Sequence, residues 1–269
     1  MKRYKFEFLV IVFFTSLLFL TFLLPDHYQK ILVLDKAAFG FWQILLHSYV
    51  HEEINHFLSN LIIFIILFLL GAIIAKNSSK EKEFYKYFAI LLVLVPIFTG
   101  TVFYLWVPLQ TMRGISDIVC SLLGLTLYFS LIYFNQGSKI IVDLRSIKTT
   151  IFIFVFLLTI FLAVFVEPFI VAGICAFEAG LFLILKVFKN YSLSQIVSER
   201  KKFVLLFIVL VLVCCFPVLV QVKFTSSGWL DGLSHFYGFY LGFTTPFFLQ
   251  QLSLLKNNWG DSIGKKKKI

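Results

Sequence analysis

The chain has 269 residues, of which 60% are apolar and only 14% are charged. A soluble domain of this size has too little interior to bury so much apolar surface, which excludes an ordinary soluble enzyme, a coiled coil or a disordered chain. The net charge of +10 would suggest a nucleic-acid partner in a soluble chain, but an excess of Lys and Arg is typical of the cytoplasmic loops of membrane proteins. We therefore expect an integral protein of the lipid bilayer and no nucleic acid.

The first apolar run, 6–24, follows a basic start and has no small-residue cleavage pattern before Pro25. It is therefore predicted to be a retained membrane span rather than a signal peptide. Residues 25–53 form the longest predicted outer connection. Its apolar and aromatic stretch 37–49 is too short to cross a bilayer, and we expect it at the membrane interface.

Seven further apolar runs follow along the chain: 54–75, 86–107, 115–134, 149–166, 168–187, 203–222 and 230–254. Residues 149–187 would extend ~58 Å as one helix, which exceeds a hydrocarbon core of ~30 Å. Glu167 and Pro168 interrupt this segment, so we predict two short spans joined by an outer turn. The fold class is therefore all-α, a polytopic membrane helix bundle with eight spans.

The positive charges give this bundle an orientation. With the N-terminus inside, 20 of the 24 Lys and Arg residues fall on inner segments and four on outer segments. This asymmetry predicts that both termini are cytoplasmic and that the protein is a multi-pass protein of the cell membrane. The four cysteines all lie in apolar runs without a C-x-x-C pattern, so we expect neither a metal site nor a cofactor.

Polar residues from three distant spans are predicted at one membrane depth. The second, fourth and eighth spans all run from outside to inside, so their first turns lie at the outer surface. These turns carry His56 and Asn60, Ser116, and His235 respectively. Ionisable and polar groups at such depth are costly and usually functional.

This set of side chains suits acyl transfer. A serine hydroxyl needs a general base, which His235 would supply to Ser116. His56 and Asn60 share one helical face and can both donate hydrogen bonds to an oxyanion. Small residues would let the serine and histidine helices approach closely: Gly114, Ser121 and Gly124 on the fourth span, and Gly238 and Gly242 on the eighth.

Three patterns in this order resemble the rhomboid intramembrane serine proteases. They are His51-x4-His56-x3-Asn60, Gly114-Ile115-Ser116 and His235-x2-Gly238-x3-Gly242. The resemblance implies a serine endopeptidase in which Ser116 is the nucleophile and His235 the base. His56, Asn60 and the Ser116 backbone N–H would bind the oxyanion, and His51 would support the site. The implied substrate is a membrane protein cleaved within or beside its transmembrane segment; the oligomeric state stays open.

The resemblance covers about 1–135 and 203–254 of a single integral membrane domain, 1–269, and leaves an inserted hairpin at about 149–187. Several residues depart from the family pattern. Gln43 replaces the Arg of a common Trp-Arg pair, Cys120 replaces an aromatic residue, and Glu178 lies within the hairpin. Asp117 follows the serine where a small residue is usual; we expect it to reach water or cap its own first turn, and Asp117→Gly to preserve or raise activity.

Two other functions fit parts of the pattern. A catalytically inactive rhomboid-like protein would bind membrane helices, and only Asp117 favours it, because Ser116 and His235 are both present. A transporter or membrane haem protein could use His56 and His235, but neither repeated halves nor further histidine pairs accompany them in the sequence.

Overall fold

The computed structural model describes residues 5–51, 53–106, 111–136 and 229–266 of the chain. Its elements are, in chain order, α1 (Lys5–Phe22), α2 (Asp26–Leu32), β1 (Leu34–Asp35), α3 (Gln43–Leu46), the 3-10 helix η2 (His47–Tyr49), α4 (Ile54–Asn77), α5 (Glu81–Trp106), β2 (Thr111–Met112), α6 (Ser116–Asn135) and α12 (Trp229–Lys266). The predicted helical bundle is thus confirmed for the described part of the chain.

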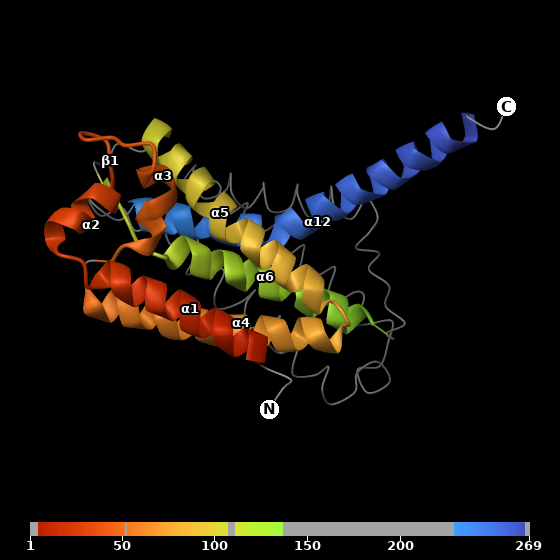
Figure 1. The fold of residues 1–269 in the computed structure, drawn as a ribbon, viewed down its shortest axis with the longest axis horizontal. Helices are drawn as coiled ribbons and strands as arrows, with labels where there is room; N and C mark the ends of the chain where they lie inside the picture. Colours follow the sequence, from red (N-terminus) through yellow and green to blue (C-terminus); the bar gives the residue numbers. More distant parts are fainter. Residues whose placement is uncertain (1–4, 52, 107–110, 137–228, 267–269) are drawn as a thin grey trace, which may run out of the picture.

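Four of the described helices, α1, α4, α5 and α6, are long and apolar enough to cross a bilayer. The last predicted span, 230–254, lies within α12, which continues to Lys266 and projects beyond the bundle (Figure 1). The predicted spans at 149–166, 168–187 and 203–222, together with Glu178, lie outside the described residues. The total of eight spans and the cytoplasmic termini therefore stay predictions.

Helix α6 forms the centre of the bundle. Of its membrane-length window 72% is buried, against 17% for α1, which shows most of its apolar surface to the surroundings. Helices α4, α5 and α12 all pack on α6, and the contact with α12 is the most extensive. The helix that begins with Ser116 is therefore the best-fixed element among those described.

Phenylalanine side chains fill the space between these helices. Phe64 stacks on Phe14 of α1 with ring centroids 4.5 Å apart, and Phe84 of α5 meets Phe129 of α6 edge to face at 5.6 Å. Aromatic pairs in these geometries contribute beyond simple area burial. Because lipid tails are as apolar as these rings, such specific packing matters more in a bilayer than the hydrophobic effect alone.

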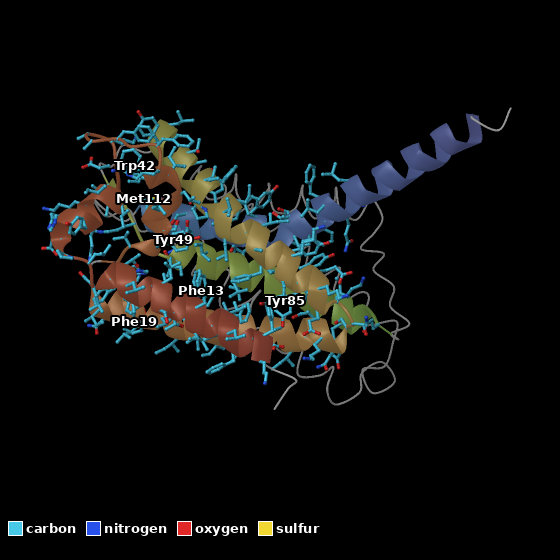
Figure 2. The ribbon with its side chains drawn as sticks, in the orientation of Figure 1. Phe13, Phe19, Trp42, Tyr49, Tyr85 and Met112 are labelled. Atoms are coloured by element: carbon cyan, nitrogen blue, oxygen red, sulfur yellow. The ribbon has the colours of Figure 1, made fainter. Side chains whose placement is uncertain are left out.

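The connection between α1 and α4 gathers at one end of the bundle, where α4, α6 and α12 all begin (Figure 1). There β1 pairs with β2 in an antiparallel register, Leu34 opposite Met112, which ties this connection to the segment before α6. Trp42 lies at this end of the molecule and is half exposed, as expected at a membrane interface (Figure 2).

Basic side chains and their acidic partners mark the opposite end. Lys76, near the end of α4, lies 3.6 Å from Glu7 of α1 and 3.5 Å from Glu81 of α5. Lys80, in the turn between α4 and α5, is 2.7 Å from Glu83. Lys76 and Lys80 are among the positive charges that the orientation prediction assigns to the cytoplasm.

Candidate functional site

Gly114 begins the turn that leads into Ser116. Its φ of 112° lies in a region that only glycine adopts readily. A Cβ at this position would meet His56 Cε1 at 3.5 Å, so the imidazole lies directly beside the turn. The glycine therefore allows the sharp backbone conformation, and His56 lies within ordinary van der Waals distance of it.

The connection before α4 holds this turn through two hydrogen bonds. The Gly114 N–H donates to the His47 carbonyl at 3.1 Å, and the Ile115 N–H donates to His51 Nε2 at 3.2 Å. Because His51 Nε2 accepts a hydrogen bond, the ring of the neutral tautomer carries its proton on Nδ1. The backbone entering α6 is thus fixed immediately before Ser116.

His51 is kept neutral by its surroundings. The side chain is buried, and that burial, with a smaller contribution from neighbouring His56, lowers the pKa of His51 to about 4. The two rings meet edge to face with centroids 5.6 Å apart. A neutral imidazole is what the hydrogen bond from Ile115 requires, so the environment and the hydrogen bond favour the same protonation state.

A partly open cavity of about 210 Å³ lies beside these histidines. Among the described residues it is lined by Val50, His51, Glu53, His56, Arg113 and Gly114. Ser116 follows two residues after the lining, half-buried at the first position of α6. Its location at a helix N-terminus places free backbone N–H groups and the positive end of the helix dipole next to the hydroxyl.

Asn60 lies one turn further into α4 than His56. Its side chain is buried, and Nδ2 has no hydrogen-bond partner among the described residues. A buried amide donor without a partner is uncommon in proteins and calls for an explanation.

Helices α6 and α12 run side by side in the same direction. The Gly238 Cα lies against the backbone of Asp117, and one turn later Gly242 lies against the backbone of Ser121. Gly124 of α6 meets the backbone of α12 in the same way. His235 lies three residues, about one turn, before Gly238, so along the parallel α6 its level corresponds to Gly114, two residues before Ser116.

Comparison with known families gives a direct answer at this point. A family model described as "Rhomboid domain" matches residues 38–190, more than half of the chain. The chain belongs to the rhomboid family. The membership of the rhomboid family that the sequence predicted is thereby confirmed. No curated protein and no solved structure matches the chain significantly.

The matched region of this rhomboid runs from the connection before α4 through α6 and across 149–187, the segment predicted as an inserted hairpin. It contains His51, His56, Asn60 and Ser116 but ends before α12. The family match therefore bears on the first two motifs, whereas the assignment of His235 depends on the packing of α12 against α6.

Asp117 does not lie where the sequence suggested. We expected a side chain that could reach water, but its exposed fraction is 1%. Oδ2 accepts hydrogen bonds from Ser48 and Thr99, each at 2.8 Å, while Oδ1 accepts the Ile118 N–H at 2.7 Å. The expected capping of the first turn is therefore present, but inside the protein, because the side chain points toward η2 and α5.

Sequence reasoning also overlooked His47, Ser48 and Thr99. The exposed fraction of each side chain is at most 2%. The sequence signal for His47 was its position four residues before His51. Nothing in the sequence linked Ser48 or Thr99 to Asp117, because 69 and 18 residues separate them along the chain.

Gln43, which stands where many relatives have Arg, organises the same connection. Its Oε1 accepts the Gly40 N–H at 3.0 Å, and its Nε2 donates to the Ile31 carbonyl at 3.2 Å. Its backbone carbonyl accepts a hydrogen bond from His47 Nδ1 at 3.0 Å. The amide side chain therefore holds together the segment that supports the turn before Ser116.

Proposed function

We propose that this rhomboid is an active intramembrane serine endopeptidase in which Ser116 and His235 form the catalytic dyad. One observation carries the proposal: α12 packs in parallel on α6 through Gly238, which supports a position of His235 within one helical turn of the level of Ser116. Close, parallel packing of this kind is what a hydrogen bond between side chains of two membrane helices requires.

The reaction follows from these two groups. The Ser116 O–H bond breaks as its proton passes to the His235 ring, while Oγ forms a bond to the substrate carbonyl carbon. The protonated ring then gives the proton to the leaving amine as the peptide bond breaks. Water then hydrolyses the acyl-enzyme. The His235 ring accepts a proton from the water as its oxygen bonds to the acyl carbon, and returns a proton to Ser116 Oγ as the ester bond breaks.

The developing oxyanion needs donors that are already in place. Backbone N–H groups at the start of α6, His56 and the buried Nδ2 of Asn60 are the candidates. The unpartnered Asn60 donor supports this assignment, because an oxyanion would supply the acceptor that the described residues do not. His51 and Gly114 act on the turn rather than on the substrate.

The proposed substrate is a membrane protein, cut within or beside its transmembrane segment near the end of the bundle where α4, α6 and α12 begin. Glu53 and Arg113 line the cavity at this end and are exposed, so water has a polar path toward the site. Hydrolysis beside a bilayer depends on such a path.

Labelling with a fluorophosphonate probe in detergent micelles tests the dyad. We expect wild type to be labelled and both Ser116→Ala and His235→Ala to lose labelling. Ser130→Ala is a matched control, because Ser130 is a buried serine on the same helix whose hydroxyl donates to the Thr126 carbonyl one turn earlier. Labelling that survives in Ser116→Ala would refute the nucleophile. A folded wild type that is never labelled and cleaves no reporter substrate would instead favour the inactive, helix-binding rhomboid.

A further inference from the structure

A buried carboxylate next to the nucleophile poses a problem for the proposed chemistry. A negative charge on Asp117 would oppose the negative charge that develops on the substrate oxygen, and little water is present to screen it. Hydrogen bonds connect Asp117 to the imidazole of His47, which can compensate this charge.

His47 lies within hydrogen-bond distance of groups on both sides of its ring. Nδ1 is 3.0 Å from the Gln43 carbonyl, and Nε2 is 3.2 Å from Ser48 Oγ. The carbonyl can only accept, so Nδ1 carries a proton in every state that keeps this bond. Gly100 of α5 leaves room for the ring, since a Cβ there would lie 3.0 Å from His47 Cε1.

Ser48 continues the chain of hydrogen bonds to Asp117. Its hydroxyl lies 2.8 Å from Asp117 Oδ2, which is also 2.8 Å from Thr99 Oγ1. Thr99 Oγ1 is in turn 2.9 Å from the Val95 carbonyl one turn earlier. The imidazole and the carboxyl group are therefore joined through a single serine hydroxyl.

Counting hydrogens determines the protonation of this network. Five hydrogen bonds connect its members from the Gln43 carbonyl to the Val95 carbonyl. The two hydroxyls and Nδ1 supply three hydrogens. One further proton, on His47 Nε2 or on Asp117 Oδ2, satisfies a fourth bond and leaves the network without net charge. A second added proton would satisfy the fifth hydrogen bond, but it would bury an uncompensated positive charge.

We propose that His47, Ser48 and Asp117 form one buried proton-sharing unit that holds a single titratable proton. Asp117 can then fix the start of α6 without placing net negative charge beside Ser116. The proton can move between the two ends as His47 Nε2–H transfers to Ser48 Oγ while Ser48 O–H transfers to Asp117 Oδ2. In this unit Asp117 and His47 are positioning residues and do not touch the substrate.

Burial and electrostatic interactions also act on the groups around Asp117. Burial lowers the pKa of His47, and the neighbouring Asp117 opposes that shift. Burial and Asp117 raise the pKa of Tyr49, so this phenol stays neutral and donates to the Leu92 carbonyl at 2.6 Å. On α12, the helix packed against Asp117, the titratable groups nearest in sequence to the Gly238 contact are Tyr237, Tyr240 and His235.

The test is a double-mutant cycle with His47→Gln and Asp117→Asn. His47→Gln removes the proton donor and leaves Asp117 a buried carboxyl group without its counterpart. We expect the thermal unfolding midpoint in micelles to fall by about 5 °C or more.

The effect of Asp117→Asn on the unfolding midpoint should differ between the wild-type and His47→Gln backgrounds. In wild type we expect it to leave stability unchanged or lower it, because it removes half of a neutral pair. In His47→Gln we expect it to restore the midpoint. His27→Gln serves as the matched control, because His27 is exposed on α2. An equal effect of Asp117→Asn in both backgrounds would overturn the proton-sharing unit.

The consequence for Ser116 rests on the proposed function and has a separate readout. We expect the fluorophosphonate labelling rate at pH 7.5 to fall at least roughly tenfold in His47→Gln and to recover in the double variant. A wild type that is not labelled would refute the dyad while the stability cycle still decides the proton-sharing unit. If the labelling rate neither fell in His47→Gln nor recovered in the double variant while the stabilities changed as expected, the positioning role of the unit would be overturned and the unit itself would stand.

Discussion

Gly238 of α12 lies against the backbone of Asp117 on α6, with no room for a side-chain carbon between them. This contact joins the helix that carries His235 to the residue next to Ser116. The distance between the proposed base and nucleophile is therefore set by a backbone-to-backbone contact rather than by flexible side chains.

Gly238→Ala should separate the two helices. The added methyl group would occupy the position of the Asp117 carbonyl, and helix backbones cannot yield as a side chain can. We expect a loss of about 1–3 kcal/mol in the free energy of unfolding and a loss of most fluorophosphonate labelling. Leu252→Ala is the control, since Leu252 is exposed on the same helix. Wild-type stability in Gly238→Ala would contradict the close contact.

His51 should make the protein sensitive to acid. Its pKa is about 4 in the folded protein against an ordinary value of 6.5, so the unfolded chain binds more protons between these pH values. Stability should therefore rise with pH across this window, and on acidification the protein should lose on the order of 3 kcal/mol. Thermal unfolding at pH 4, 5, 6 and 7 measures this dependence. His51→Gln should flatten it and His27→Gln should not; equal slopes in all three proteins would be evidence against a buried neutral His51.

Asn60→Ala should slow the reaction without unfolding the protein. Nδ2 of the side chain is a buried donor that no described residue uses, so its removal breaks no hydrogen bond of that donor with them. We expect the cleavage rate of a reporter transmembrane substrate to fall roughly 10- to 1000-fold, mainly in kcat. Ser59→Ala, at an exposed position of the same turn, is the control. An unchanged kcat would remove Asn60 from the oxyanion site.

Asp117→Gly should destabilise the protein. The sequence alone suggested that glycine would preserve or raise activity, but the buried carboxyl group accepts hydrogen bonds from Ser48 and Thr99. In the variant these two hydroxyls would lose their acceptor, and the first turn of α6 would lose its cap. We expect the free energy of unfolding to fall by about 1–3 kcal/mol. Thermal unfolding and labelling of the same sample separate lost folding from lost reactivity. If Asp117→Gly were as stable and as reactive as wild type, the expectation from the sequence that glycine is tolerated at this position would hold instead.

Much of this protein could be predicted from the sequence by itself. Long apolar runs identified α1, α4, α5 and α6, because a bilayer imposes a minimum length and composition on any span. The spacing of His51, His56 and Asn60 and the Gly114-Ile115-Ser116 motif predicted the family, which the comparison confirmed. These features depend on residues close together in the chain, so a single stretch of sequence is enough to predict each of them.

The tertiary structure alone decided which polar groups meet. The side-chain direction of Asp117 depends on η2 and α5, and the hydrogen bonds it makes join residues far apart in the chain. His47 looked like an ordinary loop residue until burial placed its ring between Gln43 and Ser48. Hydrophobic patterns specify which helices form and which faces are apolar, but not which hydroxyl reaches which carboxylate. That selection comes from the close packing of α5, α6 and η2 around a buried polar group that must find partners.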